Sequence, residues 1–369
     1  MGFSIAFSDH TVLKFSRNEL TGAIGDSVTV LPFVVAIAVL SDLSLAVMLV
    51  WFGVFQIVWG LYYGAPVSVE PMKALAALVV AGTITVGEFL LAGLILGVVL
   101  LAMGTTGTLG RVGKHIGTPV VRGVQLGVAL VLLDTGVRIG AADHRLAGLA
   151  VGVGVVLVAL GYWNVTAIVV LALGGLIAGT RSGIPSPAIP SNEGLFLVSH
   201  ASLTLPTIEA TLAQFAMTIG NAALAASVLL SDYFDRDVSP DELSTSMGAM
   251  NLVSIPFGAL PMCHGSGGIA GKYAFGARTA GANVLLGVGY IAVAFLAVGF
   301  VSAYPVAVLG VILVLIGLQL ARTSVRESET YPLVFGIGAL GLFVNLGVAF
   351  VVGVAVYLLV RRRTDRFEH

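Results

Sequence analysis

The sequence predicts an all-α polytopic membrane protein, one that crosses the bilayer many times. Hydrophobic residues make up 57% of the 369 residues, and charged residues make up only 10%. The mean hydropathy is +1.03. A soluble domain carries about 25% charged residues, so a surface this poor in charge requires lipid as its solvent.

Long uncharged stretches locate the individual spans, because a helix needs about 20 apolar residues to cross the bilayer. A first span begins near Leu20. Residues 27–41 form the end of this first span, and residues 43–69 hold a second span and a further segment. Residues 89–110 and 210–231 hold one span each. Three stretches are long enough for two spans each, namely residues 146–180, 279–321 and 330–360. We expect them to divide near Gly161, near Ser302 to Pro305 and near Asn345.

Two short segments, residues 65–82 and 258–276, are apolar but interrupted by Gly, Pro and polar residues. With both counted as spans, the total is about fourteen. Residues 181–205, rich in Pro, Ser and Gly, separate two predicted repeats of seven segments, residues 1–180 and 206–369. Because seven is odd, the repeats have opposite orientations, as in many secondary transporters. Broken segments at the third place of both halves indicate where a substrate binds.

Basic residues place both ends of the chain on the cytoplasmic side of the plasma membrane. Lys14 and Arg17 precede the first span, and Lys272 is counted among the basic residues of a cytoplasmic connection. The residues that follow the last span include Arg361, Arg362, Arg363 and Arg366. An even number of crossings satisfies this arrangement.

Composition also limits the partners. The formal net charge of −1 gives no indication of a nucleic-acid partner. The one cysteine, Cys263, excludes a disulfide framework and a cysteine-based metal site. We expect no cofactor, no metal and no cleaved signal peptide, with the lipid bilayer as the surroundings and a homodimer as one open oligomeric state.

The first broken segment predicts a helix that starts in the middle of the bilayer. Pro66 and Pro71 exclude a helix between them, so the residues from Val67 to Val69 are predicted to be extended. Pro71 suits the first turn of a helix that continues through Lys73. Free N–H groups and the positive dipole end make such a start an anion site. A proline-kinked helix without a ligand is the alternative.

The second broken segment repeats this pattern. Residues 260–263 are predicted to be extended, and His264 then precedes a helix that opens with Gly265, Ser266, Gly267 and Gly268. Glycines let backbone N–H groups approach a ligand closely, although close helix packing explains them as well. Two such helix starts that face each other favour an oxyanion.

These segments resemble the two signature motifs of the molybdate transporter family, which is allied to the sulfate permeases. The motifs are APVSVEPMKA at residues 65–74 and LPMCHGSGGIAGKY at 260–273. Residues 19–26, 121–127 and 214–221 are also similar to family motifs, so the resemblance covers most of the chain. The family usually has Gln at Glu70 and Pro at Ala216.

The resemblance implies the fold of sulfate permeases and nucleobase symporters, seven plus seven inverted spans with a core domain and a gate domain. We expect no soluble regulatory domain at the C-terminus, because only residues 361–369 follow the last span.

Polar residues inside the spans are the remaining candidates for function. Gln214, Thr218 and Asn221 follow i, i+4, i+7 spacing and are predicted to share a helix face, with interhelical hydrogen bonding as the alternative. Asp26, among glycines of the first span, is a candidate proton carrier unless it lies at the interface. The predicted substrate-binding residues are Ser68, Val69, Glu70, Pro71, Met72, Gln214, Asn221, His264, Gly265, Ser266, Gly267 and Gly268. The predicted proton carriers are Asp26 and Glu70, and the supporting residues are Lys73, Gln125 and Thr218.

The predicted function is therefore secondary import of molybdate, coupled to protons. The chain has no G-x-x-x-x-G-K-[ST] motif for ATP binding. Import of an anion against an inside-negative potential costs about 2.3 kcal/mol per charge per 100 mV, so a dianion needs co-transported cations. The alternatives are a sulfate or tungstate transporter, a nucleobase-type symporter and a passive anion channel. An enzyme is not indicated, because no intramembrane Ser/His pair or His-x-x-x-His motif is present.

Overall fold

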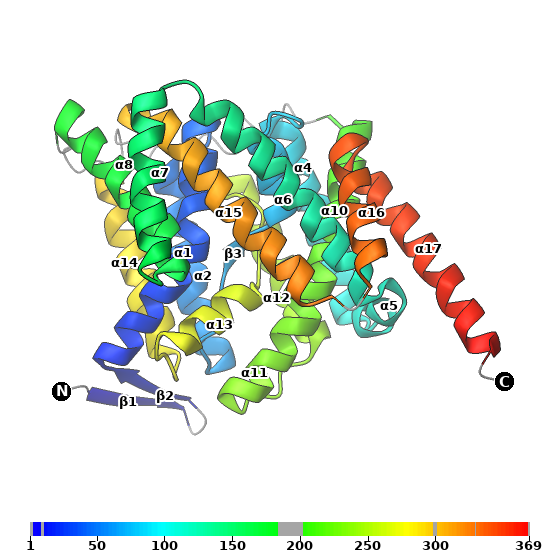
Figure 1. The fold of residues 1–369 in the computed structure, drawn as a ribbon. Coiled ribbons are helices and arrows are strands. Elements are labelled where there is room, and N and C mark those ends of the chain that lie inside the picture. The colour runs from blue at the N-terminus through cyan, green and yellow to red at the C-terminus, as the bar shows by residue number, and fades with distance from the viewer. Residues whose placement is uncertain (1–2, 9–10, 184–201, 298–300, 329, 368–369) are drawn as a thin grey trace.

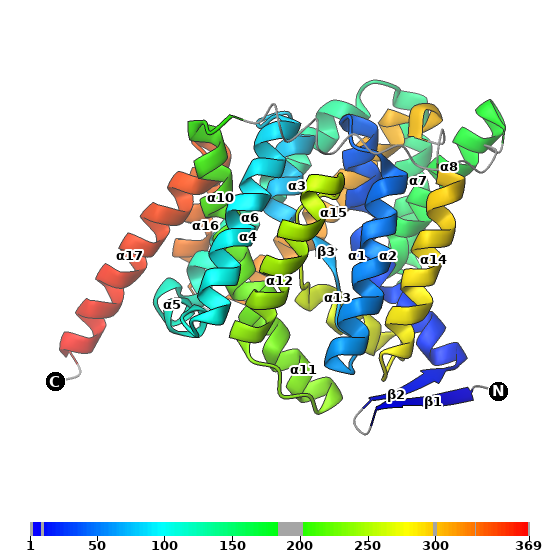
Figure 2. The same ribbon diagram turned by 180° about the vertical axis from the view of Figure 1, so that it is seen from behind.

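The computed structural model describes residues 3–8, 11–183, 202–297, 301–328 and 330–367. Most of them lie in helices that form one bundle (Figures 1 and 2). The helices of the first half are α1 (Arg17–Leu40), α2 (Leu45–Tyr63), α3 (Lys73–Val80), α4 (Val86–Thr105), α5 (Leu109–Ile116), α6 (Thr118–Gly140), α7 (His144–Ala159) and α8 (Thr166–Ser182). Most of the loop predicted at residues 181–205 lies outside the described residues.

The second half opens with one long helix in three parts, α10 (Leu205–Met217), the π-helix η2 (Thr218–Ala225) and α11 (Ala226–Phe234). It continues with α12 (Pro240–Ser254), α13 (Ser266–Ala274), α14 (Gly281–Ala297), α15 (Val306–Arg326), α16 (Tyr331–Phe343) and α17 (Leu346–Phe367). Short 3-10 turns are η1 (Trp163–Val165), η3 (Ile255–Phe257) and η4 (Val301–Ala303). The strands are β1 (Phe3–Ser8), β2 (Thr11–Phe15), β3 (Glu70–Pro71) and β4 (Met262–Cys263).

The predicted segments are present. With η1 counted as the start of α8 and α10 to α11 as one span, seven spans of the described chain have the length and composition to cross a membrane. The three long stretches divide where predicted, between α7 and α8, between α14 and α15, and between α16 and α17. The half-helices α3 and α13 are the third segments of their halves. Strand β1 and the last turns of α17 lie at the same end of the bundle, which fits an even number of crossings (Figure 1).

The packing of one group of helices repeats between the halves. α2 packs along α14, and α12 packs along α4. In the same way α1 crosses α13, and α10 crosses α3. In chain order, α1 to α4 of the first half correspond to α10, α12, α13 and α14 of the second half. With this correspondence, each contact of one half has its equivalent in the other. Helices α1 to α4 and α10 to α14 therefore form an interlocked core.

A second group of helices lies beside this core. α6 packs along α15 and α16, and α7 and α8 pack against α15. α17 packs on α16 and reaches α10 of the core. This group, α6 to α8 with α15 to α17, is the gate domain of the predicted architecture.

Glycines permit the closest helix contacts, as is common in membranes. A β-carbon added at Gly53 of α2 would lie 2.6 Å from the carbonyl oxygen of Gly287 of α14, and one added at Gly287 would collide with the Gly53 carbonyl. The same reciprocal contact joins Gly136 of α6 to Gly310 of α15, at 2.6 Å in both directions. One such contact therefore fixes a helix pair in the core and another fixes a pair in the gate.

We predict that Gly287→Val separates α2 from α14 and lowers the free energy of unfolding by about 1–3 kcal/mol, as overpacking does. Gly289→Val is the matched control, because a β-carbon there meets no atom within 4 Å. Thermal unfolding of the two purified variants in detergent measures the difference. Equal unfolding temperatures would contradict the glycine contact.

Candidate functional site

The two broken segments meet in the centre of the bundle, where they form a two-stranded antiparallel sheet (Figure 1). Glu70 pairs with Cys263 and Pro71 pairs with Met262. The N–H of Met72 then donates to the carbonyl of Pro261 over 2.9 Å. Since the prolines prevent helix here, this pairing satisfies part of the backbone that the interrupted helices leave free. Both half-helices therefore start from one buried point.

Side chains from α12 hold the second segment in place. The amide of Asn251 donates to the Met262 carbonyl over 2.7 Å and accepts from the Met262 N–H over 2.8 Å, so it acts as a further strand beside β4. His264 is fully buried; its Nδ1 lies 2.9 Å from the Ser68 carbonyl and its Nε2 lies 2.7 Å from the Ser246 hydroxyl. In this structure, His264 therefore ties the two segments together.

A carboxylate of the first half occupies the start of α13 in the second half. Glu70 Oε1 accepts a hydrogen bond from the Gly268 N–H over 2.6 Å, and Glu70 Oε2 forms an ion pair with Lys73 at 2.5 Å. Thr29 of α1 donates to the same carboxylate over 3.4 Å. A β-carbon at Gly265 or Gly268 would collide with it, so the glycines make room for a negative group at the positive end of a helix.

The start of α3 is capped by a neutral group. Gln214 of α10 accepts hydrogen bonds from the N–H of Ala74 over 2.9 Å and of Leu75 over 3.4 Å. Its amide nitrogen donates to Thr218 over 3.0 Å. Gln214 and Thr218 therefore share a face, as predicted.

Asn221 does not share that face, so this part of the prediction is wrong. Residues 218–225 form a π-helix, whose wider turn breaks the i, i+4, i+7 relation. Asn221 instead accepts a hydrogen bond from Arg122 of α6 over 3.2 Å. Arg122 also donates to Gln125 over 2.8 Å and forms an ion pair with Glu327. The cluster joins the core to the gate.

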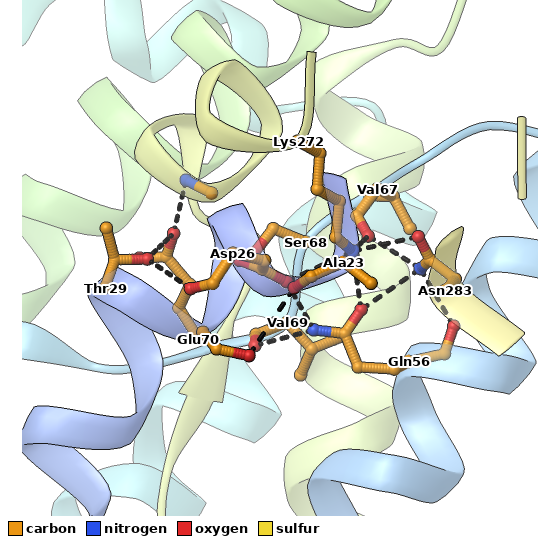
Figure 3. A network of polar contacts seen from close by, with 12 residues as sticks. Ala23, Asp26, Thr29, Gln56, Val67, Ser68, Val69, Glu70, Lys272 and Asn283 are labelled. Atoms are coloured by element: carbon orange, nitrogen blue, oxygen red, sulfur yellow. Dashed lines mark hydrogen bonds and ion pairs between the residues drawn. The ribbon is translucent and has the colours of Figure 1, made fainter. Parts of the chain in front are cut away.

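Asp26 is fully buried, which excludes the alternative of an interface position. Its carboxylate accepts from Ser68 over 2.6 Å and from Gln56 over 2.7 Å (Figure 3). Lys272 of α13 lies 3.1 Å away and is also fully buried. The prediction of Lys272 in a cytoplasmic connection is therefore wrong. Its position in a broken apolar segment was the signal that it is an intramembrane charge.

The site opens on one side. Gly267 is exposed, Ser266 and Thr29 are half-buried, and 18% of the Lys73 side chain is exposed. A β-carbon at Gly267 would meet nothing closer than Lys73 Nζ, at 3.8 Å. The start of α13 is therefore approachable from the direction of Lys73, whereas Ser68, Glu70 and Gln214 lie behind it at 0–1% exposure.

The arrangement defines a multi-pass membrane transporter with a bilayer-embedded, anion-compatible centre. The transmembrane domain of the cyanobacterial bicarbonate transporter BicA superposes with a TM-score of 0.69 at 17% identity, over 95% of this chain and 99% of that one. The murine anion transporter Slc26a9 superposes with a TM-score of 0.64 at 16% identity, over 94% of this chain and 68% of that one. These likenesses confirm the predicted fold of seven plus seven inverted segments.

The family follows from sequence. The model described as "Molybdate transporter of MFS superfamily" matches residues 18–132 and 206–320. Molybdate transporter 2 of Arabidopsis thaliana is 30% identical over 94% of this chain and 88% of the relative. The chain belongs to the molybdate transporter family.

The two matched segments have equal lengths, and Asp26 and Gln214 lie equally far from the first residue of their segments. Each residue stands at the start of the other half's broken helix. Gln214 caps α3, and a β-carbon at Gly268 of α13 would collide with Asp26. One repeated position thus carries a carboxylate in the first half and a neutral amide in the second.

We predict that Asn251→Ala destabilises the protein, because it leaves the buried N–H and carbonyl of Met262 without these partners. Each unsatisfied buried group costs about 1–3 kcal/mol. Asn164→Ala, at an exposed position of η1, serves as the control. Denaturant unfolding of the purified variants measures the effect, and an Asn251→Ala protein as stable as the control would show that β4 needs no clamp.

Proposed function

We propose that this chain imports molybdate across the plasma membrane by alternating access, with protons as the coupling ions and both termini in the cytoplasm. Membership of the molybdate transporter family supports the substrate, and the anion-transporter fold supports movement of the core relative to the gate. A homodimer and the division into repeats at residues 1–180 and 206–369 stay predictions.

One observation carries the proposal. The start of α13 already holds an oxyanion, the Glu70 carboxylate, on the Gly268 N–H. A tetrahedral oxyanion presents the same kind of acceptor to the same donor. The proposed binding step is an exchange, in which the substrate takes the place of the carboxylate at Gly265 to Gly268 and gains Lys73 as its counter-charge.

The other predicted residues surround this position. Ser68 and the backbone of Val69 to Met72 form the wall opposite α13, and Gln214 supplies a neutral amide at the start of α3. Asn221, bonded to Arg122 in this structure, would act on substrate only after leaving that partner. Thr218 accepts from the Gln214 amide and would orient it. Gln125 accepts from Arg122, the partner of Asn221, and would hold that arginine in place.

Charge balance supports proton coupling. Four charged groups lie around the two helix starts, Asp26 and Glu70 against Lys73 and Lys272, and in their ionised forms their charges cancel. A dianion that enters such a buried, neutral centre needs added positive charge, because an uncompensated charge in low dielectric is costly. Protonation of Glu70 would add one positive charge and would release both Gly268 and Lys73 for the substrate. Asp26 is the second carboxylate that could take a proton.

The alternatives have distinct tests. Sulfate and tungstate are dianions similar in shape to molybdate, so molybdate uptake into proteoliposomes is measured against excess sulfate and, separately, against excess tungstate. A nucleobase-type symporter would leave molybdate uptake at background. A passive channel would transport molybdate at a rate that an imposed proton gradient does not change.

We predict that Gly267→Val abolishes molybdate uptake and leaves the protein folded. The position faces open space beside Lys73, so a branched side chain would fill the approach to α13 without striking the backbone. Gly267→Ala is the control and should keep most of the activity. Normal uptake by a well-inserted Gly267→Val protein would remove the start of α13 from the substrate path.

We predict that Glu70→Gln still binds molybdate but loses most of the stimulation of uptake by an inward proton gradient. The amide keeps the shape of the carboxyl group and cannot carry a proton. Uptake in proteoliposomes with and without a pH gradient, next to binding by the purified protein, separates coupling from affinity. If the variant keeps the wild-type pH dependence, Glu70 is not the proton carrier and Asp26 becomes the candidate.

A further inference from the structure

The ammonium group of Lys272 lies at the centre of four oxygen atoms (Figure 3). Its Nζ is 2.7 Å from the carbonyl oxygen of Val67, 2.8 Å from Oε1 of Gln56, 2.8 Å from Oδ1 of Asn283 and 3.1 Å from Oδ2 of Asp26. All four oxygens come from elements other than the helix that carries Lys272. The side chains of Lys272, Asp26, Gln56 and Asn283 are all fully buried.

The surrounding hydrogen bonds aim these oxygens at the ammonium group. The amide nitrogen of Gln56 donates to Asp26 and to the Val69 carbonyl, so its oxygen must face the other way. The amide nitrogen of Asn283 donates to the carbonyls of Gln56 and Val67. Both amides are therefore fixed by partners other than Lys272, and their oxygens would stay in place without it.

The ligand set is that of a small cation. It combines one carboxylate, two amide oxygens and the carbonyl of Val67, which the extended segment between α2 and α3 frees from helical hydrogen bonding. Oxygen ligands of this kind bind hard cations. In transporters with broken helices, unwound backbone carbonyls beside the substrate coordinate the coupling cation. An ammonium group has three N–H donors, and here it meets four oxygens.

We propose that these four oxygens form a monovalent-cation site that the chain fills with its own Lys272 ammonium, in the place of a coupling metal ion. The tethered cation sits one helical turn behind Gly268 and is linked through Asp26 to Ser68 of the opposite wall. It therefore stabilises the geometry of the anion site permanently, and transport needs neither Na⁺ nor K⁺. The inference rests on the proposed function for its uptake readout.

The test compares the wild-type protein with Lys272→Ala in proteoliposomes whose medium contains choline, sodium or potassium chloride at equal ionic strength. Wild-type molybdate uptake should be the same in all three salts. Lys272→Ala should lose uptake by about tenfold or more in choline, because a buried carboxylate is left unpaired, and sodium or potassium should restore much of it. Lys272→Met, which removes the charge but fills the space, should not be restored by either ion.

A second measurement needs no substrate. The unfolding temperature of purified Lys272→Ala in detergent should rise by about 3 °C or more when potassium or ammonium chloride replaces choline chloride, since a bound cation stabilises the folded state. The wild-type protein and Lys272→Met should not respond. Ammonium is kept to this measurement because ammonia dissipates the pH gradients of the uptake assay.

Three outcomes would overturn the proposal. A wild-type protein that requires sodium or potassium overturns the proposal even if Lys272→Ala does not fold. So does a folded Lys272→Ala protein that is as active as the wild type in choline, or one that no cation restores or stabilises. Absence of wild-type molybdate uptake in every salt would instead reject the proposed substrate, and the unfolding measurement would still test the cation site.

Discussion

The fold depends on the pairing of two interrupted helices at the centre of the membrane. Inside a bilayer, each backbone N–H and carbonyl needs a partner within the protein, and a helix that breaks in mid-membrane leaves several without one. Pairing of the two-residue strands β3 and β4 satisfies part of this need. The side chain of Asn251 satisfies the N–H and carbonyl of Met262 in β4. At the helix starts, Gln214 and Glu70 accept from N–H groups of α3 and α13. Each broken helix is thus completed by residues of the other half, which makes the two halves inseparable.

The same centre also holds a high density of charge. Two carboxylates and two lysines lie within the part of the core that holds the helix starts, and every one of them has an opposite partner, Glu70 with Lys73 and Asp26 with Lys272. Removal of one member of a buried pair costs far more than the pair contributes, so these groups constrain one another strongly. The Glu70–Lys73 pair reaches the surface through Lys73, whereas the Asp26–Lys272 pair is fully buried. In the proposed cycle Glu70 and Lys73 exchange partners with the substrate, and Asp26 and Lys272 keep their positions.

Much of this architecture could be predicted from the sequence. Prolines 66, 71 and 261 with the glycines at 265, 267 and 268 located both breaks, because their effects on the backbone are local. The spans followed from hydropathy for the same reason. The partner of a side chain is a property of the fold, so neither Glu70 reaching Gly268 nor Lys272 reaching Val67 could be obtained from spacing. The π-helix at residues 218–225 was missed as well, since no proline or charge marks it, and Asn221 was assigned to the wrong face in consequence.

The two helix starts are chemically different, and this difference suits them to different steps of the proposed transport. α3 is capped by Gln214, a neutral group that is 1% exposed, whereas α13 is capped by the Glu70 carboxylate beside an open approach. Gln214 lies on α10, which continues through the π-helix to Asn221, and Asn221 is bonded to Arg122 of the gate. In the proposed cycle, movement of the gate relative to the core acts along one helix on the cap of α3, while exchange of anions takes place at α13. On this proposal, the neutral start of α3 couples the two halves and the charged start of α13 binds the substrate.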